Sequence, residues 1–229
     1  MVVACQHFTL VSWYQIFTTN PGNMKQKTNK KANRRLIPII GLLLAPIVNC
    51  FADSAQTMRF TIIRHQKAIG QVITSSSQCS QGYQLILHAE MKEKFILELR
   101  IQNRVENVFG KEGLITSNIE RKINGNTKIS HRVKYNNGAY TCEGRGGFEG
   151  PIPMKITFTV TMLYFQEPLG QQEIYSEPYK RMVTIKNLGD GVYRIRQPDG
   201  NATDFHYRGG SLVKVIAQSS YGEVTFVRI

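Results

Sequence analysis

Acidic side chains are missing from the first 52 residues of this 229-residue chain, although six lysines and arginines lie there. The apolar run LIPIIGLLLAPIV that follows the basic residues is only 13 residues long. It is short for a transmembrane helix, which needs roughly 20 residues to cross about 30 Å of hydrocarbon. A basic stretch, an apolar stretch and the small-residue zone NCFADSA, in that order, predict a signal peptide over residues 24–52 that is cleaved after Ala52. We therefore expect a periplasmic or secreted protein.

Residues 1–23 have no place in such a signal peptide, because its basic region begins only at Met24. We interpret residues 1–23 as a misassigned start. The alternative is an N-terminal extension with an amphipathic anchor built on Trp13, Tyr14 and Phe17. A lipoprotein signal also stays open because Cys50 follows the apolar stretch, but lipidation favours a small residue at the position of Asn49.

Cysteine is scarce in the expected mature chain, where only Cys79 and Cys142 remain. In an oxidising compartment they could form one disulfide, or they could stay as two free thiols, since spacing alone does not show that their Cβ atoms meet. Neither belongs to a CxxC pair, so we expect no zinc or redox centre.

Familiar catalytic and cofactor motifs are also absent. The chain contains no GxSxG, no HExxH and no GxxxxGK[ST] sequence. The glycine-rich stretch 144–150 lacks the lysine and hydroxyl of a phosphate loop, and we interpret it as a bend between strands. Four histidines of the mature chain lie on separate predicted strands without metal-ligand spacing: His65, His88, His131 and His206. We expect no metal and no cofactor.

The formal net charge of +13 overstates the charge of the mature domain. Without the six basic residues of the signal, 23 basic residues stand against 16 acidic ones, a net charge of +7. This excess is compatible with peripheral contact with an anionic envelope surface. A predicted hairpin carries a basic face made of Lys122, Lys128, Arg132 and Lys134. Aromatic residues for base stacking do not alternate with these charges, so we expect no nucleic-acid partner.

Alternating apolar and polar residues recur along the mature chain at intervals of about ten residues, with turn signals between them. The clearest hairpin turns are Asn124-Gly125 and Asn137-Gly138, and Ala68-Ile69-Gly70 is taken as an earlier turn. The alternation also predicts strands over residues 95–101 and 156–164. We expect residues 53–229 to form a single, monomeric all-β domain. Its fold would be one antiparallel, strongly curved sheet or barrel of roughly ten strands.

Apolar faces of two predicted strands could form either core or a ligand pocket, because an underfilled barrel interior is a cavity. These candidate ligand-binding residues are Phe158, Val160, Met162, Tyr164, Phe205 and Tyr207. In the same strand, Leu163 and Phe165 would occupy the opposite face, which predicts burial on both sides. Glu167 at the strand end is expected to accept backbone N–H bonds from a neighbouring turn.

The segment LYFQEP at 163–168, followed by Tyr175-Ser176-Glu177, resembles the "LYFxEP … FSE" signature of a bacterial exported family, domain of unknown function 6134. The resemblance extends over roughly residues 58–229. It implies export and an all-β fold, and it supplies no catalytic residue because the family has no established activity. The residues that carry the signature are Leu163, Tyr164, Phe165, Glu167, Pro168, Ser176 and Glu177.

Three classes of function remain open from the sequence. The first is a non-enzymatic binding or carrier module for a lipid or another amphipathic small molecule. The second is a hydrolase of unrecognised type that uses Glu167, Asp204 and His206. The third is an envelope interaction protein that uses a sheet edge. Amphipathic strands without clustered acid–base groups favour the binding module.

Overall fold

The structure is a computed structural model that describes residues 55–94, 98–145, 155–219 and 222–229. The expected signal peptide and its cleavage site lie outside the described residues, as do most of the glycine-rich stretch and residues 95–97 of the predicted strand 95–101. No helix among the described residues is long and apolar enough to cross a membrane.

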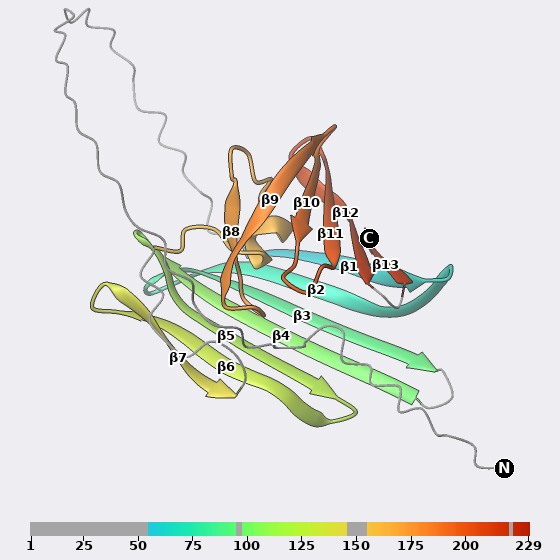
Figure 1. The fold of residues 1–229 in the computed structure, drawn as a ribbon, viewed down its shortest axis with the longest axis horizontal. Helices are drawn as coiled ribbons and strands as arrows, with labels where there is room; N and C mark the ends of the chain where they lie inside the picture. The colour runs from blue at the N-terminus through green and yellow to red at the C-terminus, as the bar shows by residue number, and fades with distance from the viewer. Residues whose placement is uncertain (1–54, 95–97, 146–154, 220–221) are drawn as a thin grey trace, which may run out of the picture. The chain divides into compact units, whose positions relative to one another are not determined.

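Thirteen strands form one sheet, in which every pair of neighbours is antiparallel. The first seven strands are β1 (Gln56–Arg64), β2 (Lys67–Cys79), β3 (Gly82–Lys94), β4 (Glu98–Gly110), β5 (Gly113–Ile123), β6 (Asn126–Asn136) and β7 (Ala139–Arg145). A short 3₁₀ helix η1 (Thr161–Tyr164) comes before β8 (Glu173–Ser176), β9 (Arg181–Gly189), β10 (Val192–Arg196), β11 (Ala202–Arg208), β12 (Ser211–Ser219) and β13 (Gly222–Arg228). The strand order is β7-β6-β5-β4-β3-β2-β1-β13-β12-β11-β10-β9-β8 and can be followed in Figure 1. The predicted all-β, antiparallel single sheet is confirmed, with thirteen strands where roughly ten were expected.

The sheet curves strongly. This follows from contacts inside it between residues that lie near its two ends in strand order. His131 of β6 has its Nε2 atom 3.2 Å from the carbonyl oxygen of Glu177, which directly follows β8. Asn107 of β4 has its Nδ2 atom 2.8 Å from the Glu177 carboxylate. A flat sheet would separate β4 and β8 by the full width of nine strand spacings of about 4.8 Å each.

Tight turns predicted from Asn-Gly pairs are present. Asn124 and Gly125 have φ of 49° and 79°, and Asn137 and Gly138 have φ of 50° and 86°, as a two-residue hairpin loop requires. The first turn lies earlier than predicted, at His65 and Gln66 (φ 45° and 63°), so residues 68–70 belong to β2 instead.

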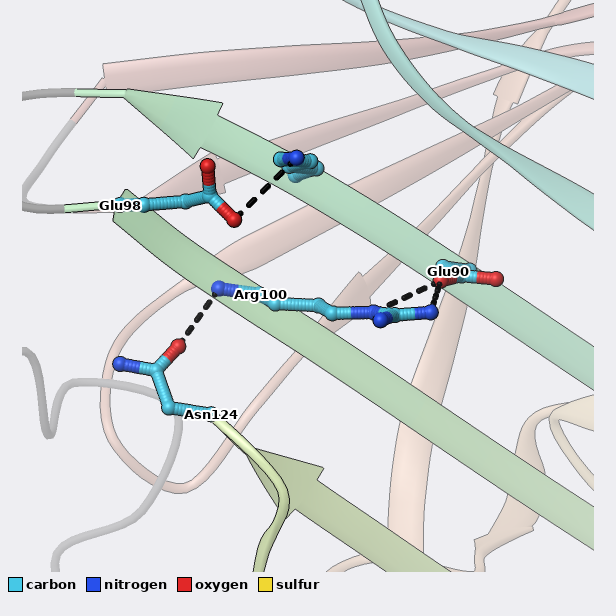
Figure 2. A network of polar contacts seen from close by, with 5 residues as sticks. Glu90, Glu98, Arg100 and Asn124 are labelled. Carbon is cyan, nitrogen blue, oxygen red and sulfur yellow. Dashed lines mark hydrogen bonds and ion pairs between the residues drawn. The ribbon is translucent and has the colours of Figure 1, made fainter.

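Asn124 also ties its turn to β4, as Figure 2 shows. Its Oδ1 accepts the Arg100 backbone N–H at 2.8 Å. The backbone N–H of Asn124 also donates to the Arg100 carbonyl at 2.8 Å. The Arg100 guanidinium in turn donates to the Glu90 carboxylate on β3, with Nε at 2.9 Å. The turn thus continues the β4 pairing beyond Ile123, and the exposed ion pair adds little to stability.

The predicted strand over residues 156–164 is wrong in its second half. Backbone hydrogen bonds join Tyr175 to Phe158 and Val160, and Thr159 between them is bridged to Tyr175, so the chain is extended beside β8 up to Thr159. From there the hydrogen bonds span three residues, Met162 N–H to the Thr159 carbonyl at 3.1 Å being the first, and the chain turns into η1. All four η1 residues are buried, so the apolar side chains that alternate in sequence pack around a helix in the interior of the sheet. Leu163 and Phe165 therefore do not form an opposite strand face.

The candidate disulfide does not form in the structure, where both cysteines are free. Cys79 ends β2 and Cys142 lies on β7, with four strands between them in the sheet. A disulfide requires Cα atoms about 4.4–6.8 Å apart, little more than one strand spacing.

Candidate functional site

An apolar cavity of about 260 Å³ lies inside the curved sheet. One wall comes from the inward side chains of β1 to β5, and the other comes from β10 to β13. Because side chains alternate along a strand, residues two apart on β3 and β4 line the cavity together, among them Leu87, Ala89, Met91, Ile101 and Val105. The period-two pattern of the sequence thus creates a largely apolar lining.

Of the six candidate ligand-binding residues, the structure brings three to the cavity: Val160, Tyr164 and Phe205. The other three, Phe158, Met162 and Tyr207, are buried core residues that do not line it. The turn at η1 separates Met162 from Tyr164, which a strand would have placed on one face. Tyr207 instead donates its hydroxyl to the Leu163 carbonyl at 2.6 Å and thereby holds η1 in place.

Tyr164 forms part of the cavity wall through two aromatic contacts. Its ring meets Phe60 edge-on at 5.4 Å and Phe205 at 6.3 Å, both near the perpendicular geometry that aromatic pairs favour. Burial, and secondarily the nearby Glu177 carboxylate, raise the pKa of Tyr164, so it presents a neutral hydroxyl at physiological pH.

Polar side chains also reach the cavity, and the sequence analysis did not select them. Arg64 of β1 and Glu93 of β3 form an ion pair at 2.6 Å with 13% of each side chain exposed. Asn103 of β4 and Arg121 of β5 face each other in register and both line the cavity. The signal that could have found them is a polar residue in an inward position, such as Asn103 between Ile101 and Val105.

A buried polar cluster adjoins the cavity around Glu177, which is 1% exposed. Its Oε1 accepts the backbone N–H of Thr161 at 3.0 Å and the side-chain amide of Asn107 at 2.8 Å. Because Thr161 is the first residue of η1, its N–H has no acceptor within that helix. Glu177 therefore caps η1, and this explains why the chain turns there.

The expected role of Glu167 is corrected by this arrangement. Glu167 accepts the hydroxyl of Tyr193 at 2.9 Å, and the carboxylate that accepts a backbone N–H is Glu177. Burial raises the pKa of Tyr193, and its hydrogen bond to Glu167 adds to this effect. Both carboxylates of the signature thus have partners within the protein.

The three hydrolase candidates do not converge. Asp204 accepts two hydrogen bonds from Arg194 at 2.7 Å each, on the face of the sheet opposite to Phe205. His206, two residues further along β11, follows Asp204 on that face, whereas Glu167 contacts Tyr193 on the interior face. Burial lowers the pKa of His206, the positive Lys214 lowers it further, and Asp204 opposes this. A catalytic pair with Glu167 would need both groups on one face.

Metal ligands are not gathered at the cavity or elsewhere in the described ranges. No group of three or more His, Cys, Asp or Glu side chains that could hold a metal ion occurs there. The basic hairpin face is partly neutralised by Glu120, whose carboxylate lies 3.1 Å from Lys122 Nζ.

Comparison with known proteins places the chain without naming an activity. No curated protein matches it. Among solved structures it is similar to the crystal structure of a beta-barrel-like protein of domain of unknown function DUF1849 from Brucella abortus. That match has 11% sequence identity and a TM-score of 0.49, and it covers 76% of this chain and 94% of the other. A family model described as domain of unknown function DUF6134 matches residues 60–229, and the chain belongs to this family.

Proposed function

We propose that this domain is a non-enzymatic binding or carrier module of the cell envelope that holds a lipid or another amphipathic small molecule. The apolar cavity inside the sheet is the observation that carries the proposal. Its volume of about 260 Å³ is close to the lower end of the roughly 300–1,000 Å³ of ligand pockets. Such pockets are lined by apolar side chains with a few polar groups, as this one is.

The cellular location belongs to the same proposal. The basic, apolar and small-residue order over residues 24–52 supports export with cleavage near Ala52, and the net charge of +7 that remains supports contact with an anionic envelope surface. A carrier in that compartment, acting as a monomer without a cofactor, would shield an apolar molecule from water.

Filling the cavity tests the proposal. Ala89 lies on β3 with its methyl group toward the cavity, and Ala89→Leu adds three carbon atoms to that space. We expect this variant to bind the neutral fluorescent probe phenylnaphthylamine about tenfold more weakly than the unchanged protein, because a filled pocket must be overpacked to admit the probe.

The matched control is Ala68→Leu, which adds the same atoms at an exposed position at the start of β2. It should bind the probe like the unchanged protein. Equal probe affinity in both variants would show that the probe occupies another place and would contradict the proposal. Thermal unfolding of both variants confirms that each is folded.

A further inference from the structure

The lining of the cavity changes from apolar to polar along the strands that form it. On β3 it passes from Leu87 to Glu93, and on the opposite wall it passes from Phe205 to Thr203 along β11. Five antiparallel pairings separate these two strands, so the C-terminal end of β3 and the N-terminal end of β11 lie at the same end of the sheet. Both walls therefore become polar in the same direction.

Exposure to solvent changes in that direction as well. We call the buried apolar part of the lining the inner end, and its side chains include Ile62, Val72, Leu87, Val105, Phe205 and Val215. We call the partly buried or exposed part with polar groups the mouth, and it includes Arg64, Glu93, Gln197, Thr203 and Gly222. The ring of Tyr164, which contacts Phe60 and Phe205, forms a wall at the inner end. A molecule therefore reaches the inner end through the mouth.

The two ends of the cavity offer a polar headgroup different surroundings. At the mouth, the ion pair of Arg64 and Glu93 keeps contact with water, so a headgroup beside it stays hydrated. At the inner end, a headgroup would lose its hydration among apolar side chains, which is unfavourable without new hydrogen bonds. The buried carboxylate of Glu177 also lines the cavity, but its Oε1 already accepts two hydrogen bonds from the protein. A hydrocarbon chain, in contrast, gains from burial at the inner end.

We propose that the cavity binds a single-chain amphiphile with its hydrocarbon chain first, so that the chain points toward Tyr164 and the headgroup stays at the mouth beside Arg64 and Glu93. The inference rests on the proposed binding function and adds to it the class of the ligand and its orientation. A single chain fits because the volume of about 260 Å³ is close to the lower end of ligand pockets.

Chain length tests which part of the ligand is buried. Octanoate, nonanoate and decanoate share one headgroup and differ only in their methylene groups, and displacement of phenylnaphthylamine from the unchanged protein measures their affinities. We expect each added methylene to tighten binding about three- to fourfold, as full burial of a methylene predicts. In the opposite orientation the chain would extend from the mouth into water, and its length would change the affinity little.

Tryptophan fluorescence tests the orientation directly. The only tryptophan of the sequence is Trp13, so the expected mature chain has none, and a single one can be introduced at either end of the cavity. Phe205→Trp marks the inner end and Gln197→Trp marks the mouth. A bromine atom quenches tryptophan fluorescence only at close contact. We expect 10-bromodecanoate, brominated at the chain end, to quench Phe205→Trp more strongly than Gln197→Trp, and 2-bromodecanoate, brominated beside the carboxylate, to do the reverse.

The matched control is Ala68→Trp, at the exposed start of β2 and outside the cavity lining. Both brominated probes should quench it equally and weakly. Thermal unfolding of the three variants confirms that each is folded.

The outcomes separate the orientation from the binding function. Displacement of phenylnaphthylamine together with a reversed quenching pattern, or with no difference between the two bromine positions, would overturn the inference while the binding function stands. An affinity that does not change with chain length would also overturn it. If none of the carboxylates displaces phenylnaphthylamine, the proposed function itself fails. Should Phe205→Trp not fold, the chain-length series in the unchanged protein still decides.

Discussion

The buried His131 is expected to make the domain less stable in mild acid. Its side chain points inward from β6 and is 5% exposed. Because a carbonyl oxygen can only accept, His131 Nε2 carries the hydrogen in the 3.2 Å contact with the Glu177 carbonyl, and a proton must add at Nδ1. Burial and the positive Lys180 lower the pKa of His131 to about 4, although the hydrogen bond to Glu177 opposes this.

The sign and size of the effect follow from the difference between folded and unfolded chains. An unfolded histidine has a pKa of about 6.5, so between about pH 6.5 and pH 4 the unfolded chain binds a proton that the folded chain does not. His131 therefore contributes its full stability above pH 6.5 and loses it as the pH falls toward 4. Each pH unit within this window lowers the free energy of unfolding by about 1.4 kcal/mol, at most about 3 kcal/mol in all.

Urea unfolding at pH 7 and pH 4.5 measures this loss. His131→Gln keeps an amide N–H that can donate to the Glu177 carbonyl but cannot be protonated, so it should lose about 2 kcal/mol less than the unchanged protein between these pH values. The exposed His88→Gln on β3 is the control and should behave like the unchanged protein. The reasoning fails if His131→Gln loses as much stability as the unchanged protein does.

Two further predictions concern the signature carboxylates and the expected start of the mature chain. Glu177→Ala should lower the free energy of unfolding by about 3–5 kcal/mol because it leaves two buried donors without an acceptor, whereas Glu167→Ala, which removes one bond to a tyrosine hydroxyl, should cost about 1–2 kcal/mol. Similar losses in urea unfolding would contradict the distinction. N-terminal sequencing of the exported protein should find a start near Asp53, and a mature protein that retains Met24 would refute the predicted signal peptide.

Local sequence signals predicted the antiparallel sheet well, because its hairpins depend on residues that are close together in the chain. Asn124-Gly125 adopts the positive φ values that make this pair a turn signal. The pairing of the Asn124 side chain with Arg100 could not be foreseen, because it depends on where β4 lies in space. The number of strands was underestimated because several runs have weaker alternation, such as β9 with its exposed end from Lys186 to Gly189.

The candidate site was predicted only in part, for a reason seen in the segment 156–164. Alternation of apolar residues fits a strand, and the chain is in fact extended up to Thr159. The turn into η1 depends on the Glu177 carboxylate, which is supplied from residues beyond β8, so no pattern within the segment contains it. The prediction of a strand through residue 164 also placed Met162 at the cavity, which it does not line. Tyr164 does line the cavity, but from η1 and not from a strand.

The two halves of the family signature are best understood as one contact. Thr159 pairs with Tyr175 through the hydrogen bonds of its two neighbours, and two residues after Tyr175 the Glu177 carboxylate caps the turn that presents Tyr164. Tyr164 and Glu177 both line the cavity, so the contact that stabilises the interior also forms part of the site. One residue can therefore be required both for folding and for the shape of the cavity. A loss of binding in a signature variant can be interpreted only when the stability of that variant is also measured. This is why the test of binding under the proposed function rests on Ala89, which belongs to the wall but not to the signature.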